Sequence, residues 1–181
     1  MATKKKTSKT EKLLEALRSG DESVRRAAAR YRHATPQVLL AALTDENKHV
    51  RGNAAYNRNA TPEVLLVALK HKDYFVRRSA ADNPNATPEV LLIALKDEDV
   101  VVRCNAAANT NATPEVLLIA IKDEYEDVRW NAADNPDATP EVLLLAMKDE
   151  SKNVREAAKE AIEKNPLLSL QVSALQAKAS S

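Results

Sequence analysis

Side chains that usually carry catalysis or bind metals are sparse in this sequence. Histidine occurs three times, at His33, His49 and His71, and no two of these lie at the i, i+4 spacing of a helical metal site. The single cysteine, Cys104, can form neither an internal disulfide nor a cysteine-based metal cluster. Two glycines are too few for a Gly-rich phosphate loop. We therefore predict no catalytic residues, no metal, no cofactor and a protein that is not an enzyme.

The remaining chemistry is that of recognition, because the charge is spread unevenly along the chain. The net charge is +1, yet residues 1–58 hold 13 Lys and Arg against 6 Asp and Glu, whereas residues 59–181 hold 14 against 20. A basic end is able to follow a nucleic-acid backbone. Nucleic-acid binding through this end is one hypothesis, and a solvated tail before a basic capping repeat is the alternative. The residues concerned are Lys4, Lys5, Lys6, Lys9, Lys12, Arg18, Arg25, Arg26, Arg30, Arg32, Arg51 and Arg58.

The elements that hold these residues repeat every 26 residues. The phrase "NATPEVLL" begins at Asn59, Asn85 and Asn111, with close copies at His33 and Asp137. A Val-Arg pair recurs with the same step. A fixed period of this size is typical of a solenoid, in which each unit packs on the next. The five full units are 21–46, 47–72, 73–98, 99–124 and 125–150, followed by a partial unit, 151–176.

Each unit is predicted to form two short helices. The second, which we name the TP helix, begins at the Thr-Pro pair, since Thr is a favourable N-cap and Pro suits the first helical position. Its unbroken apolar run, such as "VLLVAL", predicts burial on all sides. The first, the VR helix, carries the Val-Arg pair and places Val102, Ala106 and Asn109 on one face. Short links make neighbouring helices antiparallel.

The ends of the chain keep the same register. Residues 10–18 predict a leading TP helix, and Pro166 begins a trailing one. The trailing helix has Ser169, Gln171 and Ser173 where inner units are apolar, as a terminal cap requires. We predict an all-α solenoid of about six repeats and about 13 helices. The predicted segments are a flexible basic tail (1–9), a single repeat domain (10–176) and a flexible C-terminus (177–181).

The unit "VRxxAAxNPxATPEVLLxALKDE" resembles the leucine-rich repeat variant family and is also similar to HEAT-like repeats of the phycocyanobilin-lyase type. The resemblance covers residues 10 to about 166. It implies a right-handed superhelix of paired helices. One helix of each pair in that family can be partly 3₁₀, whereas the longer unit in this chain favours two full α-helices. The iron–sulfur cysteine cluster of some members has no counterpart, because Cys104 stands alone.

Positions that stay constant between units predict the contacts that hold the stack together. Each Val-Arg arginine is expected to bind an Asp of the neighbouring turn and loop carbonyls. The asparagines of the VR helix are expected to bond the loops between repeats. The arginines are Arg25, Arg51, Arg77, Arg103, Arg129 and Arg155, with Asp45, Asp97, Asp123 and Asp149 as partners. The asparagines are Asn53, Asn105 and Asn131 (Ser79 in the third unit), and Asn57, Asn83, Asn109 and Asn135.

Positions that change between units are free to carry function. All six aromatic residues lie in the VR half of the units, and all except Tyr31 stand at positions that vary between units. The resemblance to HEAT-like repeats implies that VR helices line a concave face, and aromatics with arginine are typical of interface hot spots. We predict a non-catalytic scaffold or adaptor that binds a protein partner on this concave surface. The predicted partner-binding residues are Arg26, Arg30, Tyr56, Tyr74, Phe75, Arg78, Val101, Cys104, Trp130 and Asp134.

Two alternatives compete with this hypothesis. Phe75, Val100 and Val101 are able to pack against neighbouring helix starts instead of facing a partner, and a packing role is also open for Trp130 and Tyr56. Trp130 and Asp134 lie one turn apart and are able to hold a damaged base, as in HEAT-like DNA glycosylases, but their acidic surroundings repel phosphates.

Targeting signals add little to these predictions. The sequence has neither an apolar run long enough to span a membrane nor the apolar core of a secretory signal at its start. We expect a cytoplasmic monomer with a protein partner, no membrane contact and no small-molecule substrate.

Overall fold

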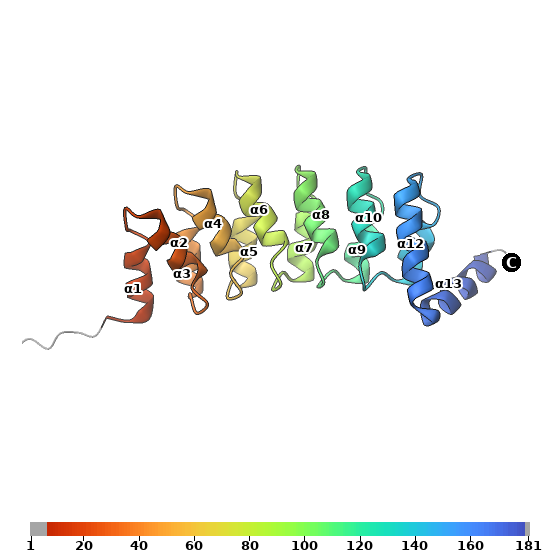
Figure 1. Ribbon diagram of the computed structural model, residues 1–181, viewed down its shortest axis with the longest axis horizontal. Coiled ribbons are helices and arrows are strands. Elements are labelled where there is room, and N and C mark those ends of the chain that lie inside the picture. Colours follow the sequence, from red (N-terminus) through yellow and green to blue (C-terminus); the bar gives the residue numbers. More distant parts are fainter. Residues whose placement is uncertain (1–6, 180–181) are drawn as a thin grey trace, which may run out of the picture. The chain divides into compact units, whose positions relative to one another are not determined.

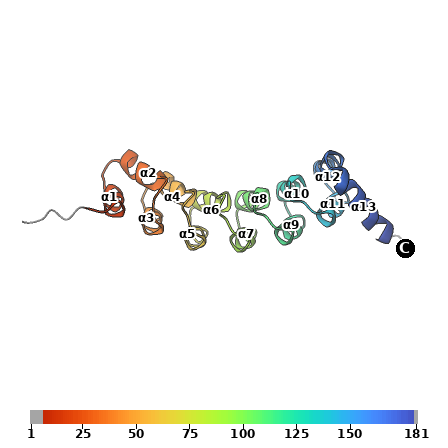
Figure 2. The same cartoon turned by 90° about the horizontal axis from the view of Figure 1, so that it is seen from below.

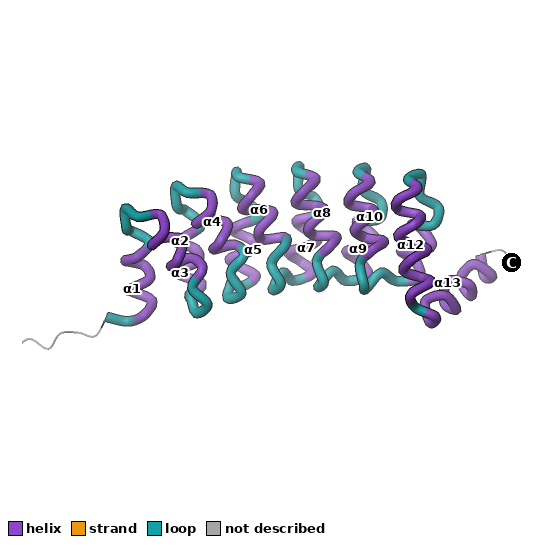
Figure 3. Tube along the Cα trace, in the orientation of Figure 1, coloured by secondary structure: helices purple, strands orange, loops and turns teal. Residues whose placement is uncertain are grey.

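The computed structural model describes residues 7–179, so Lys4, Lys5 and Lys6 of the predicted basic end lie outside the described part. Contacts divide the chain into two compact units, Met1–Ala86 and Thr87–Ser181. Within residues 7–179 there are thirteen α-helices and neither strand nor 3₁₀ helix (Figures 1 and 3). The predicted all-α solenoid of fully α-helical pairs is therefore confirmed.

The helix bounds follow the predicted register. We call the two compact units the first and the second unit, and each 26-residue segment a repeat. The first unit contains α1 (Lys9–Ala16), α2 (Glu22–Arg30), α3 (Pro36–Ala42), α4 (Lys48–Ala55), α5 (Pro62–Ala68) and α6 (Tyr74–Ala81). The second contains α7 (Pro88–Ala94), α8 (Val100–Ala108), α9 (Pro114–Ala120), α10 (Glu126–Asp134), α11 (Pro140–Ala146), α12 (Lys152–Lys164) and α13 (Pro166–Ala179). Two boundaries differ from the predicted segments. α1 begins at Lys9, within the predicted tail, and α13 continues to Ala179, so residues 177–179 are helical.

The helices of each unit form two layers (Figure 2). In the first unit the VR helices α2, α4 and α6 pack side by side, as do the TP helices α1, α3 and α5. In the second, α8, α10 and α12 form the VR layer, and α7, α9, α11 and α13 the TP layer. Neighbours in sequence therefore alternate between layers, whereas residues 26 apart lie on adjacent helices of one layer.

Helix starts are specified locally. The Asp73 and Asp99 side chains accept hydrogen bonds from the backbone N–H two residues on, at 3.0 and 2.8 Å, and so cap α6 and α8. In every TP helix except α1, Pro occupies the first position and has no N–H that needs a partner. The leading helix α1 begins at Lys9 and is capped by Ser8 instead. The side chain of Thr87 caps α7 at 3.4 Å, but those of Thr35, Thr61 and Thr113 make no cap bond. The expected threonine cap is thus only partly used.

The core lies between the two layers and corrects one expectation. Val38, Leu39 and Val50 are fully buried, as are their counterparts in later repeats. The TP helices, however, are not buried on all sides. One residue of each apolar run faces outward, and the exposed fractions are 49% for Val67, 44% for Ile93 and Ile119, and 43% for Leu145. The run is apolar throughout, but only part of it packs.

Asparagines at the ends of the VR helices bond one repeat to the preceding repeat. Asn57 Nδ2 donates to the carbonyls of Ala29 (2.8 Å) and Tyr31 (3.1 Å), and its Oδ1 accepts from the Asn59 N–H (2.9 Å). Asn83 and Asn135 repeat this arrangement. Each amide satisfies carbonyls that the end of the preceding helix leaves unpaired. This part of the predicted ladder is confirmed.

The other polar position of the VR helix behaves differently from the prediction. Asn105 and Asn131 donate to the carbonyls of Val101 (2.6 Å) and Asp127 (2.7 Å), four residues back in their own helices. Ser79 does the same with Phe75. Within residues 7–179 these three side chains make no hydrogen bond to a loop between repeats, because each binds the carbonyl of its own preceding turn instead.

The predicted arginine ladder is confirmed for Arg25, Arg103 and Arg129. Arg103 Nε donates to Asp123 Oδ2 at 2.8 Å, and Arg129 Nε to Asp149 Oδ2 at 2.7 Å. Their Nη1 atoms bond two loop carbonyls each. Arg25 pairs with Asp45 in the same way. These guanidinium groups are buried, so each charge is matched by a carboxylate and by backbone acceptors.

One rung departs from this pattern. His71 stands where other repeats have Asp, and its Nδ1 accepts the hydrogen bond from the Asp73 N–H at 3.0 Å. Arg51 instead bonds Asp73 Oδ2 through Nη2 at 2.7 Å, and its Nε is buried without a partner among the described residues. Burial lowers the pKa of His71, and the charges of Arg51 and Lys72 lower it further against the opposing charge of Asp73.

The first prediction concerns the asparagine ladder. Asn135→Ala leaves buried carbonyls of Ala107 and Asn109 without these donors, so it should lower the free energy of unfolding by about 2 kcal/mol. Asn131→Ala, four residues away on α10, is the matched control and should cost less than about 0.5 kcal/mol. Urea unfolding measures both, and equal losses would contradict the ladder.

The second prediction concerns His71. As the pH falls through about 6.5, the unfolded chain takes up a proton that folded His71, with its lowered pKa, does not. Stability is therefore lost between about pH 6.5 and the lower pKa of the folded state. His71→Asp should remove this loss and add about 1 kcal/mol at pH 7 by giving Arg51 Nε an acceptor. The difference between variant and wild type across pH isolates His71, since His33 and His49 remain in both. A constant difference would refute the assignment.

Candidate functional site

The VR helices of the first unit bring variable residues onto one surface. Arg26, Gly52 and Arg78 occupy the same register position on α2, α4 and α6. Because Gly52 has no side chain, it leaves a gap in this row between the two arginines. Tyr56, at the C-terminal end of α4, is 52% exposed.

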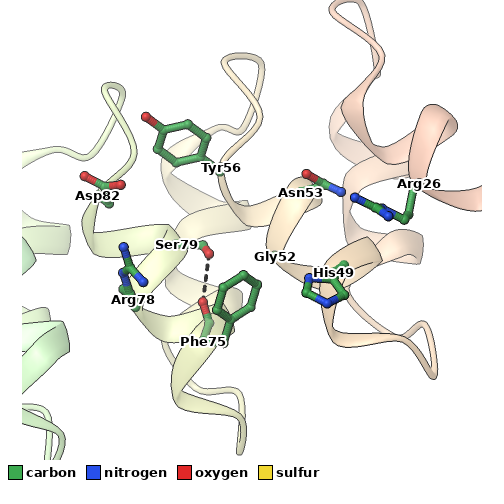
Figure 4. Close-up of a pocket in the computed structure, with 9 residues that line it drawn as sticks. All are labelled: Arg26, His49, Gly52, Asn53, Tyr56, Phe75, Arg78, Ser79 and Asp82. Carbon is green, nitrogen blue, oxygen red and sulfur yellow. Dashed lines mark hydrogen bonds between the residues drawn. The ribbon is translucent and has the colours of Figure 1, made fainter. Parts of the chain in front are cut away.

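These residues surround a hollow of about 210 Å³, which we name the Phe75 hollow. Figure 4 shows side chains from all three VR helices around it. Its lining residues are Arg26, His49, Gly52, Asn53, Tyr56, Phe75, Arg78, Ser79 and Asp82.

Gly52 and Phe75 form the floor of this hollow together. A Cβ placed on Gly52 would lie 3.0 Å from Phe75 Cδ1 and closer still to Cε1, so the ring occupies the space that a side chain would need. The His49 ring meets the Phe75 ring edge-on, with centroids 5.7 Å apart. Phe75 therefore packs on the preceding VR helix, as the packing alternative proposed, while remaining partly exposed in the hollow.

The hollow carries charges that do not neutralise one another closely. Arg78 and Asp82 lie one turn apart, but they form no ion pair within the described part of the chain. Partial desolvation raises the pKa of Asp82 against the opposing charge of Arg78. Arg26 makes only a long contact of 3.7 Å with exposed Glu22. The two arginines are thus available to an external group.

A second hollow of about 230 Å³ adjoins the first, and we name it the arginine hollow. Asn53 and Tyr56 line both hollows. The arginine hollow contains no carboxylate among its lining residues, which are Arg30, Arg32, Asn53, Tyr56, Asn57 and Arg58.

The predicted residues of the second unit lie on α8 and α10. Val101 is 38% exposed, Trp130 is 39% exposed, and Asp134 ends α10. Burial raises the pKa of the Cys104 thiol, and the charges of Asp127 and Asp123 add to this effect. A thiol that stays protonated is a poor nucleophile, so Cys104 has the character of a packing residue.

The structure thus brings part of the predicted set together. Arg26, Tyr56, Phe75 and Arg78 line the Phe75 hollow, and Arg30 lines the arginine hollow. Tyr74 is 49% exposed at the start of α6 but lines neither. That these residues bind a partner stays a prediction.

Several lining residues were absent from the predicted set. His49, Gly52 and Asp82 share register positions with predicted residues, and that signal was available in the sequence. Arg32 and Arg58 follow the VR helices in corresponding loops and had been assigned only to the basic end. The arginine hollow therefore extends from the VR helices into the loops that follow them.

Within residues 7–179, no three His, Cys, Asp or Glu side chains gather as metal ligands would. None of the helices in that range combines the length and apolarity needed to cross a bilayer.

The paired helices, the two-layer packing and the repeated rungs define a helical repeat protein of the all-α solenoid class. Within that class, the chain is similar to a solved leucine-rich repeat variant with a repetitive structural motif, at a TM-score of 0.63 and 28% sequence identity. The match covers 92% of this chain and 71% of that one. The resemblance to leucine-rich repeat variants predicted from the repeated phrase is confirmed.

Other comparisons add little. Two engineered proteins of known crystal structure match at 19% identity and TM-scores of 0.47 and 0.45, over 87% of this chain and 98% and 96% of theirs. No protein-family model matches the chain, and no curated protein matches it.

The third prediction tests the floor of the Phe75 hollow. In a Phe75→Ala background, Gly52→Ala should raise the free energy of unfolding by about 0.5–1 kcal/mol, because alanine favours the helix. In the wild type the same change must displace the Phe75 ring, so the gain should vanish or reverse. Chemical denaturation of the four proteins gives the coupling between the two sites. A coupling energy near zero would mean that the ring does not rest on Gly52.

Proposed function

We propose that the chain is a non-catalytic scaffold that binds a protein partner through the VR surface of its first unit. The observation that carries the proposal is the Phe75 hollow, where residues that break the repeat lie together. Tyr56 presents an exposed ring there, Phe75 forms an apolar floor, and Arg26 and Arg78 lie on either side. Tyrosine and arginine around a desolvated centre are the residues in which interface energy concentrates.

The repeat framework supports a binding role rather than a catalytic one. A solenoid holds its helices by contacts that recur in every unit, so outward positions change without loss of the fold. Such a surface suits recognition of an extended segment. The proposal includes a monomeric, cytoplasmic protein, since a single cysteine without a disulfide partner is compatible with a reducing compartment.

The fourth prediction tests this function. Affinity capture from the native cell should retain a partner with the wild type. The amount of captured partner should fall at least tenfold with Tyr56→Ala or Arg78→Ala, as expected for hot-spot truncations of about 2 kcal/mol. Tyr125→Ala is the matched control, because Tyr125 is equally exposed, at 50% against 52%, and lies in the other unit. Circular dichroism checks that each variant is folded.

Three outcomes separate the hypotheses. Retention of the partner by both first-unit variants would overturn the proposed surface. Loss with Trp130→Ala alone would move the site to the second unit. The nucleic-acid alternative predicts a gel shift at low salt that weakens as salt rises, and absence of a shift at low salt removes it.

A further inference from the structure

We infer that the arginine hollow is a binding site for a phosphate monoester carried by a phosphorylated segment of the protein partner. The inference rests on the proposed function and specifies the partner's chemistry.

The first observation is that the arginines of this hollow lack partners, unlike those of the framework. Within residues 7–179, neither Arg30 nor Arg58 makes a side-chain hydrogen bond or an ion pair, and Arg32 bonds only His33 Nε2, at 2.8 Å. By contrast, Arg103 and Arg129 are each paired with a carboxylate. All three guanidinium groups are exposed, and no carboxylate among the lining residues of the hollow neutralises them, so their charge is available to an anion.

The second observation is an additional free donor. Asn53 occupies the register position of Asn105 and Asn131, whose amides donate to carbonyls of their own helices. Asn53 makes no such bond within the described structure, and its side chain lines the hollow. The amide and the Tyr56 hydroxyl are therefore available beside the arginines.

The third observation is that the framework does not require these residues. At the positions of Arg30 and Arg58, the repeat 99–124 has Ala108 and Thr110, and the repeat 125–150 has Asp134 and Pro136. These repeats form the same helix pairs and the same asparagine rung. The arginines are therefore not explained by the fold.

The arrangement favours a single, doubly charged anion. Arg30 ends α2, Arg32 follows in the next loop, and Arg58 comes from the loop after α4, yet all three line one hollow of about 230 Å³. Arginine forks bind phosphate oxygens in pairs, and a phosphate monoester offers three acceptor oxygens and nearly two charges at pH 7. The arginine hollow has no carboxylate among its lining residues, which suits one compact anion. An extended polyanion would instead follow Arg30 and Arg32 into a neighbouring hollow that Arg26 also lines, and the probes below separate the two cases.

The fifth prediction uses three probes that each carry about two negative charges at pH 7.5: acetyl-Ala-phosphoserine-Ala-amide, acetyl-Glu-Glu-amide and the trinucleotide of thymidine. NMR titration of the labelled full chain should show saturable shifts at Arg30, Asn53 and Arg58 with the phosphopeptide. Binding should be at least tenfold weaker for the other two. Equal or tighter binding of diglutamate would make the site an acidic-segment site, and tighter binding of the trinucleotide a nucleic-acid site; either result overturns the inference.

The variants test which arginines act. Arg30→Gln and Arg58→Gln should each weaken phosphopeptide binding by about tenfold, the loss of one charge-assisted pair. Lys48→Gln is the control, because Lys48 is exposed at the start of α4 and lines neither hollow, and it should change phosphopeptide binding less than twofold. Uniform losses in all three variants would indicate general charge attraction and refute a built site.

The pH dependence identifies the ligand group. Since the second ionisation of a phosphate monoester has a pKa of about 6, phosphopeptide binding should weaken between pH 7.5 and 5.5, whereas diglutamate should not. Partial burial raises the pKa of Asp82, and protonation of this carboxyl removes negative charge beside the hollow, which would strengthen binding at low pH. Asp82 therefore cannot produce the expected loss. A flat profile would contradict monoester recognition.

A last comparison separates this inference from the proposed function. If the partner captured by the wild type is lost after phosphatase treatment of the lysate, both stand. If capture survives phosphatase but still depends on Tyr56, the phosphate inference fails and the protein-binding proposal remains. If no capture depends on Tyr56 while the phosphopeptide binds, the proposed surface fails by itself.

Discussion

The hydrogen bonds that the asparagine at the end of each VR helix donates to the preceding repeat are the interaction on which the rest of the repeat depends. The last carbonyls of a helix have no partner within it, and burying them unpaired costs free energy. Asn83 supplies two donors to the carbonyls of Ala55 and Asn57, at 2.7 and 3.0 Å, while its own oxygen accepts from the Asn85 N–H. This bonding fixes how far one VR helix can slide along the preceding one. Residues 26 apart therefore stay on adjacent helices, and the outward rows keep their register.

The polar rungs and the apolar core already hold the stacked helices in place. Arginine therefore has two different roles, one inside the framework and one at the surface. Arg103 is buried and paired with Asp123 at 2.8 Å, so its charge is neutralised within the framework. Arg30 is exposed and unpaired within the described structure. Composition alone does not separate the two. The presence or absence of a carboxylate partner does, since an unpaired charge at a surface hollow is available to a ligand.

The repeat explains what could be predicted from the sequence. Register comparison found the helix pairs, the Arg–Asp rung and the outward row, because these depend on positions separated by one period. It missed the contact of Gly52 with Phe75, which joins different positions of neighbouring units. It overestimated the burial of Val67, because an apolar residue is tolerated at a surface without being packed. It also gave Asn105 a partner in a loop, although the carbonyl of its own preceding turn is nearer.

The two hollows together would give a bound segment a direction. Tyr56 and Asn53 line both, so a ligand in one lies beside the other. The arginine hollow has three arginines and no carboxylate among its lining residues, whereas the Phe75 hollow combines an apolar floor with Arg26, Arg78 and Asp82. A segment that placed its charged group at Arg58 and an apolar side chain over Phe75 would satisfy both. The reversed segment would place its anion where Asp82 offsets part of the charge of the two arginines, so the difference in charge across α4 would favour one orientation.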